Sequence, residues 1–219
     1  MRILVLNGSP RPHGNTKKMV NAFREGAESV GHQVDVVDVC QKKIAGCLAC
    51  EYCHTKGGGI CVQKDDMQEV YALLGEAEVL LIASPIYYHG ITGQLKCVLD
   101  RFYAAAYPQR PPHLKKAAMI LSSGDADMYD GAMFSFKGDF LDYLGLENAG
   151  IYTAHGGENG SSEKLEELKK SWYVIKVNKN TGSNGRVLCG SGILCGEIRM
   201  RRKLKINVRD EKEQEDLLT

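Results

Sequence analysis

Val79-Leu-Leu-Ile-Ala83 is an uninterrupted apolar stretch of five residues, and it decides the fold class of this chain. A strand with one face in water alternates apolar and polar residues, whereas this stretch is typical of a strand buried on both faces. Strands of that kind belong to parallel sheets that helices cover on both sides. The stretch therefore predicts an α/β fold.

Further strand patterns alternate with helical ones along the chain. Strands are expected at 3–6, 34–39, 117–121 and 150–154, and helices at 15–30, 65–77, 92–106, 129–144 and 161–172. Asn15 is expected to cap the first helix, because asparagine is a preferred N-cap residue. Successive βα units predict a doubly wound five-stranded parallel sheet of flavodoxin-like order 2-1-3-4-5, with a cysteine-rich loop after the second strand.

The loop after the first strand has the features of a phosphate site. In such a sheet, ligands bind beyond the carboxyl ends of the strands, where the strand order reverses. Loop 7–16 offers four polar side chains at a helix N-terminus, where free N–H groups favour a phosphate; they are Ser9, Arg11, Asn15 and Thr16. The loop lacks both the P-loop and the dinucleotide glycine patterns, so a monophosphate fits better. The alternative is an ordinary capped turn.

The loop after the third strand, Ser84-Pro-Ile-Tyr-Tyr-His-Gly90, brings apolar and aromatic groups to the same rim. Such groups suit a flat ring, and a flavin fits that surface. His89 is a candidate hydrogen-bond partner for the ring, and a solvated loop histidine is the alternative. For any single aromatic residue of the loop, the alternative is a plug at the end of the sheet. The loop at 122–127 adds small residues and backbone donors.

A cysteine run separates the second strand from the next helix. Cys47, Cys50, Cys53 and Cys61 form a C-x2-C-x2-C-x7-C pattern. The spacing predicts three sulfurs on one side of a tight turn, with the glycines at 57–59 folding the backbone back so that Cys61 completes a four-thiolate cage. Such a cage suits a [4Fe-4S] cluster or structural zinc, and free thiols are the third possibility. We expect this loop, residues 40–64, to leave the sheet at the same rim as loop 7–16. That position favours the cluster, because a redox centre there could exchange electrons with a flavin.

Several motifs occur in an order that resembles the NAD(P)H-dependent FMN reductases of flavodoxin-like fold. They are Asn7-Gly-Ser-Pro-Arg11, Gly14-Asn-Thr16, Ser84-Pro-Ile-Tyr-Tyr88, Gln94-Leu-Lys96 and Asp100-Arg101. The cysteine run followed by Asp65-Asp66-Met67 resembles the iron-sulfur flavoprotein branch of that family.

The resemblance implies a set of cofactor contacts. It implies that the FMN phosphate is held by Ser9, Arg11, Asn15 and Thr16. It implies that the flavin ring lies along Pro85, Ile86, Tyr87, Tyr88, His89 and Gly90, and against Ser123 and Gly124. A homodimer or homotetramer is also implied. No catalytic residue is assigned, because hydride transfer to a flavin depends on positioning more than on an acid or base.

Length and charge set limits on the partners. The chain has 219 residues with 28 Lys and Arg against 27 Asp and Glu, so no net field draws it to nucleic acid or to a membrane. No apolar run approaches the roughly 20 residues that cross a bilayer. We expect a cytoplasmic protein with one FMN-binding domain at 1–175 and a poorly ordered C-terminal extension at 176–219.

The leading hypothesis is an electron-transfer flavoprotein that passes electrons between FMN and a [4Fe-4S] cluster. Its donor is expected to be ferredoxin or NAD(P)H, and its acceptor a small molecule or a protein. The first alternative is an NAD(P)H-dependent FMN or quinone reductase without a cluster. The second is a zinc-bearing, flavin-binding regulatory module.

Overall fold

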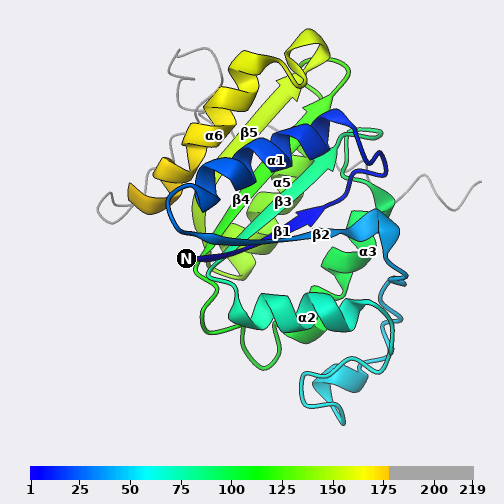
Figure 1. The fold of residues 1–219 in the computed structure, drawn as a ribbon. Helices are drawn as coiled ribbons and strands as arrows, with labels where there is room; N and C mark the ends of the chain where they lie inside the picture. The colour runs from blue at the N-terminus through cyan, green and yellow to red at the C-terminus, as the bar shows by residue number, and fades with distance from the viewer. Residues whose placement is uncertain (178–219) are drawn as a thin grey trace, which may run out of the picture.

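The computed structural model describes residues 1–177, which form a single five-stranded sheet. The strands are β1 (Arg2–Asn7), β2 (Gln33–Asp38), β3 (Val79–Pro85), β4 (Lys116–Ser123) and β5 (Glu147–His155). All pairs are parallel and the order is β2-β1-β3-β4-β5 (Figure 1). The predicted flavodoxin-like fold and strand order are confirmed. The apolar stretch 79–83 is completely covered at the centre of the sheet, between β1 and β4.

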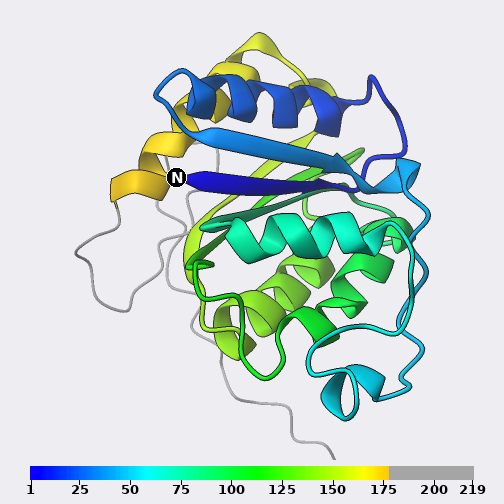
Figure 2. The same cartoon turned by 60° about the horizontal axis from the view of Figure 1, so that its bottom comes forward.

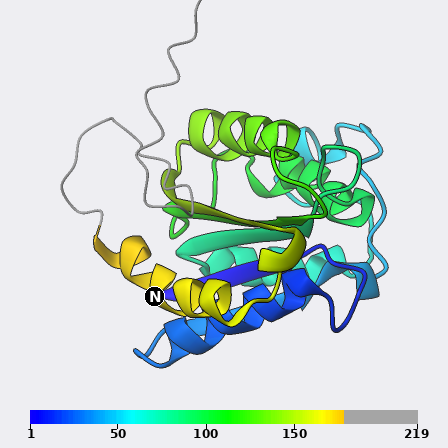
Figure 3. The ribbon, with the colours of Figure 1, turned by 90° about the horizontal axis from the view of Figure 1, so that it is seen from above.

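Helices cover both faces of the sheet. The helices are α1 (Asn15–Glu28), α2 (Met67–Glu76), α3 (Gly93–Asp100), α4 (Phe102–Ala105), α5 (Asp130–Phe136) and α6 (Ser162–Val177). Figure 3 shows α1 and α6 on one face and α5 with the α3 region on the other. Each face has its own apolar core, because the side chains of a strand alternate between the two sides. Met19 and Phe23 of α1 fill one core, and Leu95 and Val98 of α3 the other.

Several expected element boundaries differ from the structure. Gly14, not Asn15, is the N-cap of α1, and within residues 1–177 no side chain caps this helix. The helix expected at 92–106 is interrupted at Arg101, so α3 and α4 are separate. The helix expected at 129–144 is α-helical only to Phe136 and continues as a π-helix over Lys137–Tyr143. Periodicity indicated apolar faces correctly here, but it carries no information on local changes of helical pitch.

The cysteine loop leaves the rim of the sheet and extends along the helices. It begins at the end of β2, where the Cys40 thiol donates to the Gly8 carbonyl oxygen at 3.2 Å. Figures 1 and 2 show the loop, in cyan, beside α2 and the far end of α3. α3 has eight residues and is therefore about 12 Å long. The loop thus leaves the sheet at the rim, as expected, and its four cysteines border a cavity that Arg101 and Tyr103 also line.

The C-terminal extension predicted at 176–219 lies almost wholly outside the described residues, so its predicted lack of order stays untested. The last helix is longer than expected and reaches Val177. Within residues 1–177, no helix has the length and apolar character needed to span a membrane.

Candidate functional site

The loop at 7–16, termed the phosphate loop after its predicted ligand, joins β1 to the N-terminus of α1. The Thr16 side chain is only 2% exposed, and its hydroxyl lies 2.7 Å from that of Ser122 at the end of β4. Ser9 is also buried, and its N–H donates to the Asn7 side chain at 3.2 Å. Because no side chain caps α1, the N–H groups of its first turn are available to an anion.

The four predicted phosphate residues lie on this one loop but differ in exposure. Arg11 and Asn15 are exposed, whereas Ser9 and Thr16 are buried. Sequence reasoning missed Asn7, whose amide donates to Asp38 at 2.7 Å while its oxygen accepts from Ser9. A polar residue at the buried end of a strand is the feature that could have identified Asn7.

The loop after β3 is a tight turn that holds two residues in left-handed conformations. Tyr87 and Gly90 exchange backbone hydrogen bonds, and Tyr88 and His89 between them have φ angles of 48° and 61°. Left-handed backbone at bulky residues is uncommon and occurs mostly at functional sites. The Tyr88 side chain is fully exposed, at 103%. It therefore does not plug the end of the sheet.

Loops after β4 and β5 complete the rim. A Cβ atom added to Gly124 would meet no atom within 4 Å, so the space above it is open. The hydroxyl of Ser123 lies 2.9 Å from that of Tyr129, which donates to the Ala154 carbonyl oxygen. Asn159 donates to the Ser123 carbonyl oxygen at 2.7 Å, while its own side-chain oxygen is buried and has no hydrogen-bond partner among residues 1–177. Asn159 is a second rim residue that sequence reasoning missed.

The rim thus gathers most of the predicted cofactor residues. Pro85 pairs with Ser122 across β3 and β4, and the Ile86 N–H donates to the Ser122 carbonyl oxygen at 2.7 Å. Through Ser122 and Thr16, the loop after β3 is therefore connected to the phosphate loop. A buried hydroxyl pair, free helix N–H groups and an open aromatic turn fit a planar cofactor that carries a phosphate.

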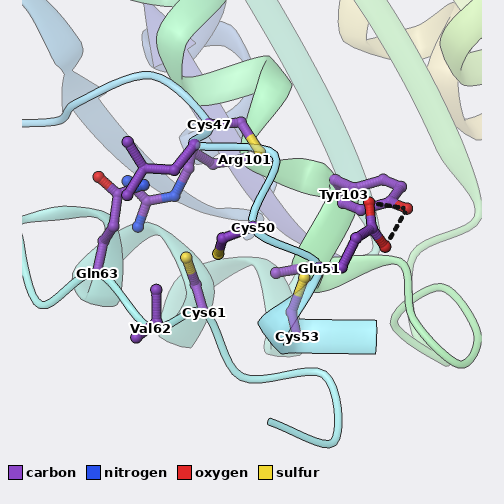
Figure 4. A pocket seen from close by; sticks show the side chains of 11 residues that line it. Cys47, Cys50, Glu51, Cys53, Cys61, Val62, Gln63, Arg101 and Tyr103 are labelled. Carbon is purple, nitrogen blue, oxygen red and sulfur yellow. Dashed lines mark hydrogen bonds between the residues drawn. The ribbon is translucent and has the colours of Figure 1, made fainter. Parts of the chain in front are cut away.

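The four cysteines border one small cavity beside α4. Figure 4 shows the sulfur atoms of Cys50, Cys53 and Cys61 directed toward a shared space. The cavity has a volume of about 20 Å³, which is room for a single ion or water. In the part of the chain that the structure describes, no three His, Cys, Asp or Glu residues are arranged to hold a metal ion. By its chemistry, a set of four thiols fits zinc or an iron-sulfur cluster.

The backbone of the cysteine loop is held in unusual conformations. Ala49 and Glu51, on either side of Cys50, have φ angles of 50° and 56°. The Ala49 N–H donates to the Cys47 sulfur at 3.4 Å. Burial raises the pKa of Cys53, and the nearby Cys61, Cys47 and Cys50 raise it further because their thiolates repel its charge.

Aromatic contacts hold the loop against α4. The ring of His54 stacks on Tyr103 at 3.8 Å and on Tyr107 at 4.1 Å, measured between ring centroids. The Tyr103 hydroxyl donates to the Glu51 carboxylate at 3.0 Å, and this bond raises the pKa of Tyr103. No sequence pattern predicts these contacts, because the residues are about 50 positions apart in the chain.

A flavodoxin-like sheet whose rim fits a flat phosphorylated cofactor indicates the class of redox proteins that bind such a cofactor. Residues 1–178 match the family described as NADPH-dependent FMN reductase, and the chain belongs to that family. It is therefore classed with the flavin-dependent oxidoreductases.

Curated relatives place the chain in one branch of the family. It is 40% identical over 111 residues to an iron-sulfur flavoprotein of Archaeoglobus fulgidus, covering 51% of this chain and 49% of that protein. A second iron-sulfur flavoprotein of the same organism is 35% identical over 73% of this chain and 78% of the relative. The chain spans about half the length of the first relatives it matches.

Solved structures agree on the fold. An NAD(P)H:quinone oxidoreductase from Methanothermobacter marburgensis superposes with a TM-score of 0.64 at 20% identity, covering 84% of this chain and 99% of that one. An FMN-dependent NADH-azoreductase from Bacillus anthracis, solved with FMN, gives 0.59 at 16% identity, covering 80% and 99%. At these identities the likeness shows the fold alone.

Proposed function

We propose that this chain is an electron-transfer flavoprotein that binds FMN at the rim and a [4Fe-4S] cluster at the four cysteines. Electrons enter from ferredoxin or NAD(P)H and leave to a small molecule or a protein. The observation that carries the proposal is the gathering of Cys47, Cys50, Cys53 and Cys61 around one cavity on a chain of the FMN reductase family. When bound, the two groups would supply the redox chemistry.

The rim residues have separable roles in this proposal. Ser9, Thr16 and the first-turn N–H groups of α1 bind the phosphate, with Arg11 and Asn15 closing over it from the exposed side. Pro85, Ile86, Tyr87, Tyr88, His89 and Gly90 form one wall for the ring, and Ser123 with Gly124 the other. The open space above Gly124 and the full exposure of Tyr88 support this arrangement.

The names of the relatives support the cluster, and the size of the cavity supports zinc as the second candidate. A cavity with room for one ion has the size that a four-thiolate zinc site needs, although the four thiols would have to move to bind the metal. The C-x2-C-x2-C spacing and the relatives described as iron-sulfur flavoproteins favour iron. A zinc centre would not exchange electrons with FMN, so the two candidates imply different functions.

Metal and flavin analysis of protein purified without oxygen tests the proposal. We expect about four irons, four acid-labile sulfides and one FMN per chain, with broad visible absorbance. Cys61→Ala should lose the iron and retain FMN, and Cys97→Ala, which changes a cysteine on α3, should retain both. FMN without iron would leave a flavin or quinone reductase, and stoichiometric zinc without turnover would leave a regulatory module.

A further inference from the structure

The cysteine loop has an incoming limb before Cys47 and an outgoing limb after Cys61. Both limbs contact one buried guanidinium group. Arg101 lies at the break between α3 and α4, and its side chain is only 1% exposed. Its Nη1 donates to Asp65 Oδ2 at 2.9 Å, and its Nη2 donates to Asp65 Oδ1 at 3.2 Å. Asp65 follows the last cysteine of the loop, so this bidentate pair fixes the outgoing limb to the helix layer.

The incoming limb reaches the same two side chains. Arg101 Nη1 also donates to the Ala45 carbonyl oxygen at 3.0 Å, and the Ala45 N–H donates to Asp65 Oδ2 at 3.1 Å. Next to this, the Lys43 N–H donates to the Asp66 carboxylate at 2.7 Å, and the Asp66 N–H to the Lys43 carbonyl oxygen. Residues some 20 positions apart are thereby held side by side at the base of the loop.

Arg101 also borders the cavity that the cysteines line. Figure 4 draws Arg101 and Gln63 with the cysteines among the side chains that line this cavity. Its Nε atom is buried and has no hydrogen-bond partner within residues 1–177. A buried cation at this point contributes both geometry and positive charge beside four potential thiolates.

We propose that Arg101 and Asp65, termed the loop clamp, are positioning residues that keep the cysteine loop closed whether or not a metal is bound. Ordering a loop of this length opposes metal binding, and a loop that is ordered in advance binds more tightly. The clamp would thus supply outer contacts of the kind that orient metal ligands. The inference rests on the proposed function only in treating the cysteines as a metal site.

The variants must remove the clamp without leaving one charge buried alone. Arg101→Met by itself would leave the Asp65 carboxylate unpaired, which is strongly destabilising. The double variant Arg101→Met/Asp65→Asn removes both charges and keeps similar volumes. Glu69→Gln is the matched control, because it breaks the exposed Lys42–Glu69 pair at 2.5 Å, which also joins the loop to α2. Circular dichroism and FMN fluorescence would establish that the sheet and the rim persist.

Limited trypsin digestion of metal-free full-length chain tests the clamp directly. Lys56 is exposed within the loop, so cleavage after it reports loop opening. We expect cleavage about tenfold faster in the double variant, which corresponds to ~1.4 kcal/mol less free energy of loop opening. The rate should be unchanged in Glu69→Gln. Equal rates in the double variant and the wild type would overturn the clamp.

Titration of the same proteins with Co²⁺, followed by the cobalt-thiolate absorption, separates the clamp from the metal site. We expect the double variant to bind Co²⁺ about tenfold more weakly than the wild type, as for other outer contacts of metal ligands. Equal affinity would contradict the role of the clamp in metal binding. No Co²⁺ uptake by the wild type, together with faster cleavage of the variant, would reject the metal site of the proposed function while the clamp stands.

Discussion

Backbone conformation at single residues distinguishes the rim from the rest of the sheet. Tyr88 and His89 are held with positive φ in a turn that two backbone hydrogen bonds close. Such conformations cost about 1–2 kcal/mol at residues other than glycine. Tyr88 buries no side-chain surface that offsets this cost, because it is fully exposed. The proposed role of its ring, as part of the wall for the flavin, would explain why a tyrosine stands here.

Tyr88→Gly should therefore stabilise the fold and weaken cofactor binding. Glycine adopts positive φ freely, so we expect the free energy of unfolding to rise by ~0.5–1 kcal/mol. Loss of the aromatic face should weaken FMN binding by ~0.5–1.5 kcal/mol. Urea denaturation and FMN fluorescence titration measure the two effects. Tyr88→Asn is the control, since asparagine tolerates this backbone but offers no ring. Unchanged FMN affinity in both variants would remove Tyr88 from the ring wall.

The Asp65 carboxylate makes the stability of the fold depend on pH in the acid range. Burial alone would raise its pKa, but hydrogen bonds from Arg101 and from the Ala45 and Met67 N–H groups lower it below the ordinary 3.8. A lowered native pKa stabilises the fold fully above 3.8, and the contribution is lost as the pH falls through the native pKa. Urea denaturation from neutral pH to below 3.8 should show this loss in the wild type. If Asp65→Asn kept the full wild-type dependence of the free energy of unfolding on pH, that result would contradict this prediction.

At the scale of elements, two glycines in helices have opposite surroundings. Gly26 of α1 lies against α6, and a Cβ atom there would be 2.0 Å from the Lys169 carbonyl oxygen. Gly75 of α2 has nothing within 4 Å of the same position. The close approach of α1 and α6 thus depends on the absence of one side chain.

Gly26→Ala should destabilise the chain and Gly75→Ala should stabilise it. The first forces two helices apart, at a cost of about 1–3 kcal/mol. The second reduces the conformational freedom of the unfolded chain without a clash, which contributes about 0.4–1 kcal/mol. Thermal unfolding followed by circular dichroism compares them. A tolerated Gly26→Ala would mean that α6 does not pack on α1 as described.

At the scale of the whole molecule, the cysteine loop is attached to the domain rather than built into its core. The Gln63 side chain donates to the Gly46 carbonyl oxygen at 3.1 Å, so the two ends of the cysteine-bearing segment are close together. Cys53 is its one buried cysteine, and Leu48, Ile60 and Val62 are exposed. Neither apolar core includes a residue from 47–62.

Replacement of residues 47–62 by two glycines should leave a folded domain that still binds FMN. We expect cooperative unfolding and FMN affinity close to those of the wild type, with complete loss of bound iron or zinc. Loop shortening changes the free energy of folding only slowly with length, which supports this expectation. Calorimetry, FMN titration and metal analysis measure the three properties. Loss of FMN binding would show that the loop supports the rim within the same chain.

Local sequence patterns were sufficient for much of the fold and for the identity of the chemical groups. The apolar stretch 79–83 indicated a central parallel strand because burial on both faces leaves no polar position. Turn residues and helix starts located the phosphate loop, and the resemblance indicated the family. Ser9 and Thr16 were predicted at the rim because loops after parallel strands meet at one edge of a sheet.

By itself, then, the sequence determined the parallel sheet, its strand order and the four thiols that form one group. Only the tertiary structure decided where those thiols lie and what holds them. The pairing of Arg101 with Asp65 joins positions 36 apart, and the stacking of His54 on Tyr103 joins positions 49 apart in the chain. No local period records such contacts, because they depend on how α3 and α4 pack against a loop from another part of the chain.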